Sequence, residues 1–144
     1  MKIHLKRLDQ EYLFEARNER GNTVLMDNKG REDGEVKGAG PMELLLMAVA
    51  GCSGIDIVSI LKKQKQEITA YDVEVDADRE EGVVPSLFKS IHVKIFLEGS
   101  IEPAKALRAA KLSFDTYCSV SKTLEKTVPI SYEVHVNGEK YEAL

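Results

Sequence analysis

The feature that most constrains the fold is an apolar stretch from Pro41 to Gln66, PMELLLMAVAGCSGIDIVSILKKQKQ. Proline is favoured at the first position of a helix, and Glu43 in the first turn complements the positive end of the helix dipole. Between residues 44 and 52 every residue is apolar or small. Such a helix is apolar all round and has to be covered on all sides. The sequence therefore predicts a long buried helix with Cys52 near its middle.

A membrane-spanning helix is the alternative for this stretch. Spanning takes about 20 apolar residues, and Asp56 and Ser59 interrupt the run. The first ten residues, MKIHLKRLDQ, lack the apolar core of a signal peptide. The net charge of −4 provides no basic surface for nucleic acid. We therefore expect a cytoplasmic protein that binds neither membrane nor nucleic acid. The length of 144 residues is typical of a single domain, which we expect to cover residues 1–144.

Alternation of apolar and polar residues predicts strands on both sides of the central helix. The expected strands lie at 2–8, 11–17, 23–26, 71–77, 90–97 and 130–136, with a turn at 18–22 and a mobile glycine-rich loop at 29–40. A second helix is expected from an N-cap at Ser100 to about Tyr117, followed by another helical turn or two. Hairpin-like pairs of strands favour antiparallel sheets and an α+β class. One sheet covers only one side of the apolar helix, so a second sheet or a partner subunit has to cover the other side. We expect a homodimer.

The chain has two cysteines, one on each predicted helix. Cys118 follows Phe114 at helical spacing on the apolar stripe of the second helix. A lone buried cysteine most often only fills space, but a pair can supply one attacking and one resolving thiol. The two could meet if the helices cross. The spacing gives no metal motif, because there is no Cys-x-x-Cys and His4, His92 and His135 are isolated on strand patterns.

Two motifs resemble those of one protein family. The segment GPMELLL from Gly40, followed by GCSGID from Gly51, is similar to the first cysteine helix of the OsmC/Ohr family. The segment YCSVSKTL from Tyr117 resembles the second cysteine motif of the same family. The resemblance implies an OsmC-like α+β fold with antiparallel sheets around long central cysteine-bearing helices. It also implies an intertwined homodimer with two active sites at the subunit interface.

The same resemblance implies thiol-dependent reduction of organic hydroperoxides. Cys52 would attack the peroxide and become a sulfenic acid, and Cys118 would resolve it to a Cys52–Cys118 disulfide. An external dithiol reductant would restore the enzyme, with no bound cofactor or metal. The family also uses an arginine from the N-terminal hairpin, paired with a glutamate directly after the proline. Arg20 is the best match for that arginine and Arg17 the second.

The acidic position departs from the peroxidase pattern. Met42 follows the proline, and Glu43 comes one residue later. Glu43 would lie about 13 Å from Cys52 along the helix and on its opposite side, so it could reach a thiol only from a loop bend or from the partner subunit. Asp56 lies one turn after Cys52 on the same face. Its carboxylate would disfavour the thiolate form of Cys52, or it would bond a neighbouring backbone group.

The shifted glutamate motivates a second hypothesis, a non-catalytic or small-ligand-binding member of the same fold. Its site would be an apolar pocket at the dimer interface, lined by Leu45, Met47, Phe114 and the two thiols. In that case Arg20 is a solvated turn residue, and Glu43 serves only the helix dipole.

Overall fold

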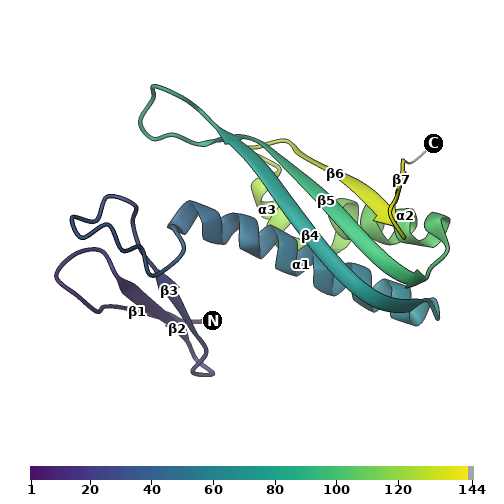
Figure 1. Cartoon of the computed structure of the whole chain (residues 1–144), viewed down its shortest axis with the longest axis horizontal. Coiled ribbons are helices and arrows are strands. Elements are labelled where there is room, and N and C mark those ends of the chain that lie inside the picture. Colours follow the sequence, from purple (N-terminus) through teal and green to yellow (C-terminus); the bar gives the residue numbers. More distant parts are fainter. Residues whose placement is uncertain (143–144) are drawn as a thin grey trace. The chain divides into compact units, whose positions relative to one another are not determined.

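The computed structural model describes residues 1–142, which divide into two compact units at Leu45 and Leu46. The first unit holds the strands β1 (Ile3–Arg7), β2 (Phe14–Asn18) and β3 (Thr23–Met26), and the first turn of helix α1 (Pro41–Lys63). The second unit holds the rest of α1 and every later element (Figure 1). The expectation of one domain over residues 1–144 stays a prediction.

The first unit is an antiparallel three-stranded sheet in the order β1-β2-β3. The turn between β2 and β3 lies where the sequence predicts it. Gly21 adopts a φ of +86° there, a conformation that glycine reaches without steric cost. The side-chain oxygen of Asn18 accepts hydrogen bonds from the backbone N–H groups of Arg20 and Asn22 at 3.0 Å each, which fixes the turn.

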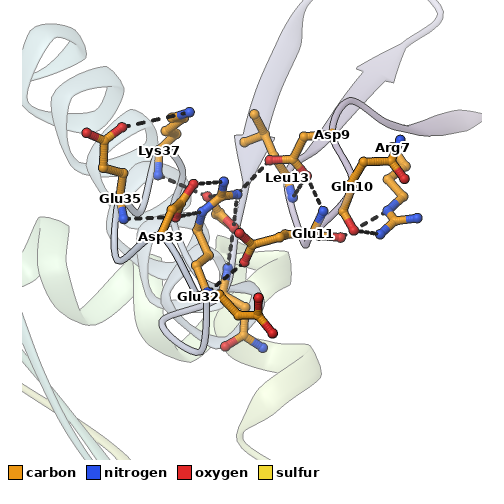
Figure 2. A network of polar contacts seen from close by, with 12 residues as sticks. Arg7, Asp9, Gln10, Glu11, Leu13, Glu32, Asp33, Glu35 and Lys37 are labelled. Atoms are coloured by element: carbon orange, nitrogen blue, oxygen red, sulfur yellow. Dashed lines mark hydrogen bonds and ion pairs between the residues drawn. The ribbon is translucent and has the colours of Figure 1, made fainter.

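A buried arginine in the loop between β3 and α1 binds several carboxylates, a network that the expectation of a mobile glycine-rich loop did not include. The Arg31 side chain is 3 % exposed. Its Nη1 atom lies 2.7 Å from Asp9 Oδ2 and 3.2 Å from Asp27 Oδ2, and its Nη2 atom lies 2.7 Å from Asp33 Oδ2. Asp27 also accepts a 3.0 Å hydrogen bond from the backbone N–H of Lys37. Figure 2 shows Asp9, Asp33 and Lys37 converging on this network from different parts of the unit.

The second unit is built on a four-stranded sheet in the order β4-β5-β6-β7. Its strands are β4 (Glu67–Arg79), β5 (Phe88–Ser100), β6 (Ile130–Val136) and β7 (Glu139–Tyr141). The neighbours β4–β5 and β6–β7 are antiparallel, whereas β5 and β6 are parallel. Between β5 and β6 the chain forms α2 (Pro103–Leu112), a π-helical turn η1 (Ser113–Tyr117) and α3 (Ser119–Leu124). These helices form the crossover connection that a parallel pair of strands requires. Because it has both antiparallel and parallel pairs, the sheet is mixed. The α+β class is confirmed.

The core of the second unit lies between this sheet and its helices. Alternate residues of β5 are at most 1 % exposed: Ile91, Val93, Ile95 and Leu97. Helix α1 contributes a fully buried stripe at four-residue spacing: Val49, Ser53, Ile57 and Leu61. The opposite side of α1 is exposed, with Met47 at 57 % and Ile55 at 74 %. A single chain therefore buries only one face of α1. The apolar sequence of this helix predicts that all of its faces are buried.

Helix α1 is long and apolar enough to span a membrane by length and composition alone. The sequence argument that the stretch is too short for a span is therefore wrong. What identifies α1 as a core helix is its contact with the sheet, because its buried stripe packs with the β5 residues in one hydrophobic cluster.

The second predicted helix is broken up in the structure. Ser100 is the last residue of β5, and Glu102, without a side-chain cap, precedes α2. The α-helix ends at Leu112, and the next five residues form the π-helical turn. Cys118 then has an extended backbone, with φ −69° and ψ 95°. The second cysteine therefore lies at a junction between helices and not on a continuous helix.

Candidate functional site

The two thiols meet inside the second unit. The Sγ atoms of Cys52 and Cys118 and a carboxylate oxygen of Asp56 all lie within 4.8 Å of one another. Both cysteines are free thiols; Cys52 is half-buried, and Cys118 is completely buried. Helix α1 supplies the first thiol and the η1–α3 junction the second. A disulfide bond is about 2.05 Å long, so the two sulfur atoms would have to move closer to form one, and the chemical roles of the two thiols stay predictions.

The π-helical turn positions Cys118. The backbone N–H of Cys118 donates a 2.8 Å hydrogen bond to the carbonyl of Ser113, five residues earlier. The backbone N–H of Ser121 then donates to Cys118 Sγ at 3.4 Å, and Ser121 Oγ lies 3.1 Å from the same sulfur. Cys118 thus caps α3 with its thiol. The π-helical turn places the Cys118 sulfur directly after η1. The spacing of apolar residues in the sequence predicts a regular helix and does not indicate this turn.

Burial is the main influence on the acidity of the second thiol. It raises the pKa of Cys118, and the neighbouring Cys52 raises it further. The hydrogen bonds from Ser121 act in the opposite direction and lower this pKa in part. Burial therefore disfavours the thiolate form of Cys118.

Asp56 is held against the thiols by a buried serine. Ser113 Oγ donates a 3.1 Å hydrogen bond to Asp56 Oδ2, and Ser113 is completely buried. Asp56 follows Cys52 by one helical turn and lies on the same face, as the sequence predicts. The hydrogen-bond partner of Asp56 is the side-chain hydroxyl of Ser113. From the sequence, a backbone group was the alternative partner expected. Sequence reasoning missed Ser113, because nothing in the sequence announces the π-helical turn that brings its hydroxyl to this carboxylate.

Asp56 also lines a pocket at the surface of the second unit. A surface pocket beside α1 is lined by Asp56, Ser59, Ile60, Lys63, Gln64, Leu112 and Tyr117. Tyr117, the last residue of η1, is 55 % exposed at its rim. Asp56 therefore lines this pocket, and a carboxylate oxygen of the same residue lies within 4.8 Å of both thiol sulfurs.

The other two predicted site residues lie in the first unit. Arg20 is exposed in the turn between β2 and β3. Glu43 caps α1, because its Oε2 atom accepts a 2.7 Å hydrogen bond from the backbone N–H of Gly40, as in a capping box. Its Oε1 atom lies 3.7 Å from Lys29 Nζ. The thiols belong to the second unit, so a role of Arg20 or Glu43 beside them stays a prediction.

Phe114, one of the residues expected to line the apolar pocket of the second hypothesis, is buried in the core of the second unit. Phe114 is 7 % exposed and stacks on Tyr132, with ring centroids 4.6 Å apart and planes 9° from parallel. It is therefore a core residue. Leu45 and Met47 are exposed, at 38 % and 57 %, and their part in an interface pocket stays a prediction.

Comparison with known proteins points to one family. The sequence model of the family described as OsmC-like protein matches residues 32–133. Protein YhfA of Escherichia coli K12 is 41 % identical over 117 residues, which cover 79 % of this chain and 84 % of YhfA. A crystal structure of a hypothetical protein from Aquifex aeolicus is 30 % identical and covers 94 % of this chain and 96 % of its own, with a TM-score of 0.78. The organic hydroperoxide resistance protein OhrB of Bacillus subtilis has the same fold at 18 % identity, with a TM-score of 0.63 and coverage of 93 % and 96 %.

Proposed function

Because the chain belongs to the OsmC-like protein family, we propose that it is a thiol-dependent peroxidase that reduces organic hydroperoxides with Cys52 and Cys118. The OsmC/Ohr family includes peroxidases, and one structural neighbour is an organic hydroperoxide resistance protein. The observation that carries the proposal is the meeting of the two thiols within 4.8 Å beside a carboxylate.

Cys52 is the attacking thiol in this proposal, because it is the more accessible of the two. Its thiolate attacks the outer oxygen of the hydroperoxide and breaks the O–O bond. The cysteine becomes a sulfenic acid, and the substrate leaves as the alcohol after it takes up a proton. Arg20 is proposed to supply the cation that favours the thiolate, and Glu43 to orient that arginine.

Cys118 resolves the sulfenic acid. Its sulfur attacks Cys52 Sγ, the Cys118 thiol loses its proton, and the sulfenic oxygen leaves as water. In this proposal Asp56, whose carboxylate oxygen lies within 4.8 Å of both sulfur atoms, takes up that proton and passes it to the leaving oxygen, which completes the water molecule. An external dithiol then reduces the disulfide and becomes a disulfide itself. No bound cofactor takes part in this cycle.

We also propose a cytoplasmic homodimer. An exposed stripe on α1 consists of Met47, Ala48, Gly51 and Ile55. It continues into an apolar groove with Gly54, Val58, Tyr71 and Val73. The Tyr71 hydroxyl is buried there with no hydrogen-bond partner within residues 1–142. A second copy that covers this stripe would complete the burial that the apolar sequence of α1 requires.

The test is a matched pair of cysteine variants exposed to limiting cumene hydroperoxide in the presence of dimedone, which traps sulfenic acids. In Cys118→Ser, Cys52 should form a lasting sulfenic acid and a dimedone adduct, because the resolving sulfur is missing. In Cys52→Ser, no adduct should form at the buried Cys118. A Cys52→Ser protein that consumes the peroxide as fast as the wild type would rule out the proposal and favour the ligand-binding hypothesis.

A further inference from the structure

We infer that the reduced protein contains a binding site for a thiophilic divalent cation of the Zn²⁺ type, with Cys52, Asp56 and Cys118 as its three protein ligands. The sequence does not indicate such a site, because the ligands come from α1 and from the distant η1–α3 junction. The inference uses the same residues as the proposed peroxidase but does not depend on that activity.

The three donor atoms are close enough to share one ion. They all lie within 4.8 Å of one another. For any such triangle there is a point no farther from each corner than 4.8 Å divided by the square root of three, about 2.8 Å. Zinc bonds are about 2.3 Å to sulfur and 2.0–2.2 Å to a carboxylate oxygen. Binding would therefore need each donor to move inward by roughly half an ångström to one ångström, which small side-chain rotations supply.

The donor set selects the kind of cation. Two thiolates with one carboxylate suit Zn²⁺ and Cd²⁺, whereas Mg²⁺ and Ca²⁺ prefer sites made only of oxygen ligands. Three protein ligands also leave a fourth tetrahedral position for water or another small ligand. Cys52 and Asp56 are half-buried while Cys118 is completely buried. The ion would therefore enter past Cys52 and Asp56.

The groups behind the ligands already hold them in place. Ser113 Oγ donates to Asp56 Oδ2 at 3.1 Å, and the backbone N–H of Ser121 donates to Cys118 Sγ at 3.4 Å. Ser113 is completely buried and Ser121 is 2 % exposed. Partners of this kind orient metal ligands, and their loss typically weakens metal binding tenfold or more. The cluster is thus a supported ligand set and not a chance meeting of surface groups.

Metal binding and disulfide formation would exclude each other. Binding consumes both thiols as thiolates and releases their protons, whereas the disulfide leaves no thiolate for the ion. A bound Zn²⁺ would therefore protect the reduced thiols from oxidants, and oxidation would release the ion. In this account the cation is an inhibitor of the redox site and takes no part in its catalytic cycle.

The experiment titrates untagged, reduced protein with Cd²⁺ and follows the thiolate-to-cadmium charge-transfer absorbance. Zn²⁺ affinity is then measured by competition with a chromophoric chelator. We expect one ion per chain. Asp56→Asn should weaken binding by at least the tenfold that is typical for loss of an outer-shell partner, because it replaces an anionic ligand with a neutral amide. Cys52→Ser should abolish the charge-transfer band of a two-thiolate site. The matched control Asp78→Asn, which changes an exposed carboxylate on β4, should bind as the wild type does.

A second readout uses only the wild-type protein, so it does not depend on the folding of any variant. Zn²⁺ should slow the alkylation of Cys52 by iodoacetamide, whereas Mg²⁺ should leave it unchanged. Absence of saturable binding, or equal affinity in the wild type and Asp56→Asn, would overturn the inference. Because neither readout uses a peroxide, zinc binding without peroxidase activity would leave this inference standing and remove only the proposed function.

Discussion

Ser113→Ala tests whether the buried hydroxyl positions Asp56 beside the thiols. The substitution removes the donor of the 3.1 Å hydrogen bond and leaves the carboxylate without this partner. An acceptor that loses its partner in a protein interior costs about 1–3 kcal/mol. Asp56 is only half-buried, so water replaces part of the bond, and we expect a loss of about 1 kcal/mol.

Urea unfolding at one fixed protein concentration measures this loss. With a slope of about 2 kcal/mol per molar urea, the unfolding midpoint should fall by about 0.5 M. Ser119→Ala is the matched control, because Ser119 is exposed. Its midpoint should stay within about 0.25 M of the wild type, since exposed substitutions usually change stability by no more than about 0.5 kcal/mol.

A double-mutant cycle isolates the hydrogen bond itself. When Asp56→Ala is combined with Ser113→Ala, the loss from the pair should be smaller than the sum of the single losses by at least about 0.5 kcal/mol. The reasoning would be refuted by effects that add within about 0.3 kcal/mol, because additivity of that quality is typical of residues that do not interact.

Two further predictions concern the two units separately. Ile95 is completely buried in the middle of β5, so Ile95→Ala should cost about 2–5 kcal/mol of unfolding free energy; a loss below 1 kcal/mol in urea would contradict this packing. The hydrogen bonds from Arg31 hold the pKa values of Asp33 and Asp9 below their ordinary value of 3.8. This contribution to stability is present above pH 3.8 and is lost as the pH falls through the lowered pKa values. The melting temperature should therefore fall more steeply below about pH 4 in the wild type than in Arg31→Met, and parallel curves for the two proteins would be the contrary result.

Alternation of apolar and polar residues placed the strand at 130–136 to the residue. The start of the central helix was placed correctly from Pro41, because proline is favoured at the first helical position. Alternation shows which side chains share a face, but it does not show the direction of a neighbouring strand. For that reason the parallel pairing of β5 with β6 was not visible in the sequence.

The parts that the sequence could not show depend on contacts between distant residues. Asp9, Asp27 and Asp33 look like ordinary loop carboxylates, and only the folded unit brings them to Arg31. The two cysteines were identifiable because each lies in a recognisable motif. Their neighbour Ser113 was not, because its position depends on a π-helical turn.

The central claim is that Cys52 and Cys118 form a redox pair, and its most direct test is a single-turnover oxidation. Reduced protein is mixed with less than one equivalent of cumene hydroperoxide, or of hydrogen peroxide in parallel, and quenched under denaturing conditions. The free thiols are then counted, and the linked peptides are identified by mass. We predict that two thiols are lost per peroxide consumed, in one Cys52–Cys118 disulfide, and faster with the organic peroxide. Survival of both thiols in an excess of either peroxide would contradict the claim.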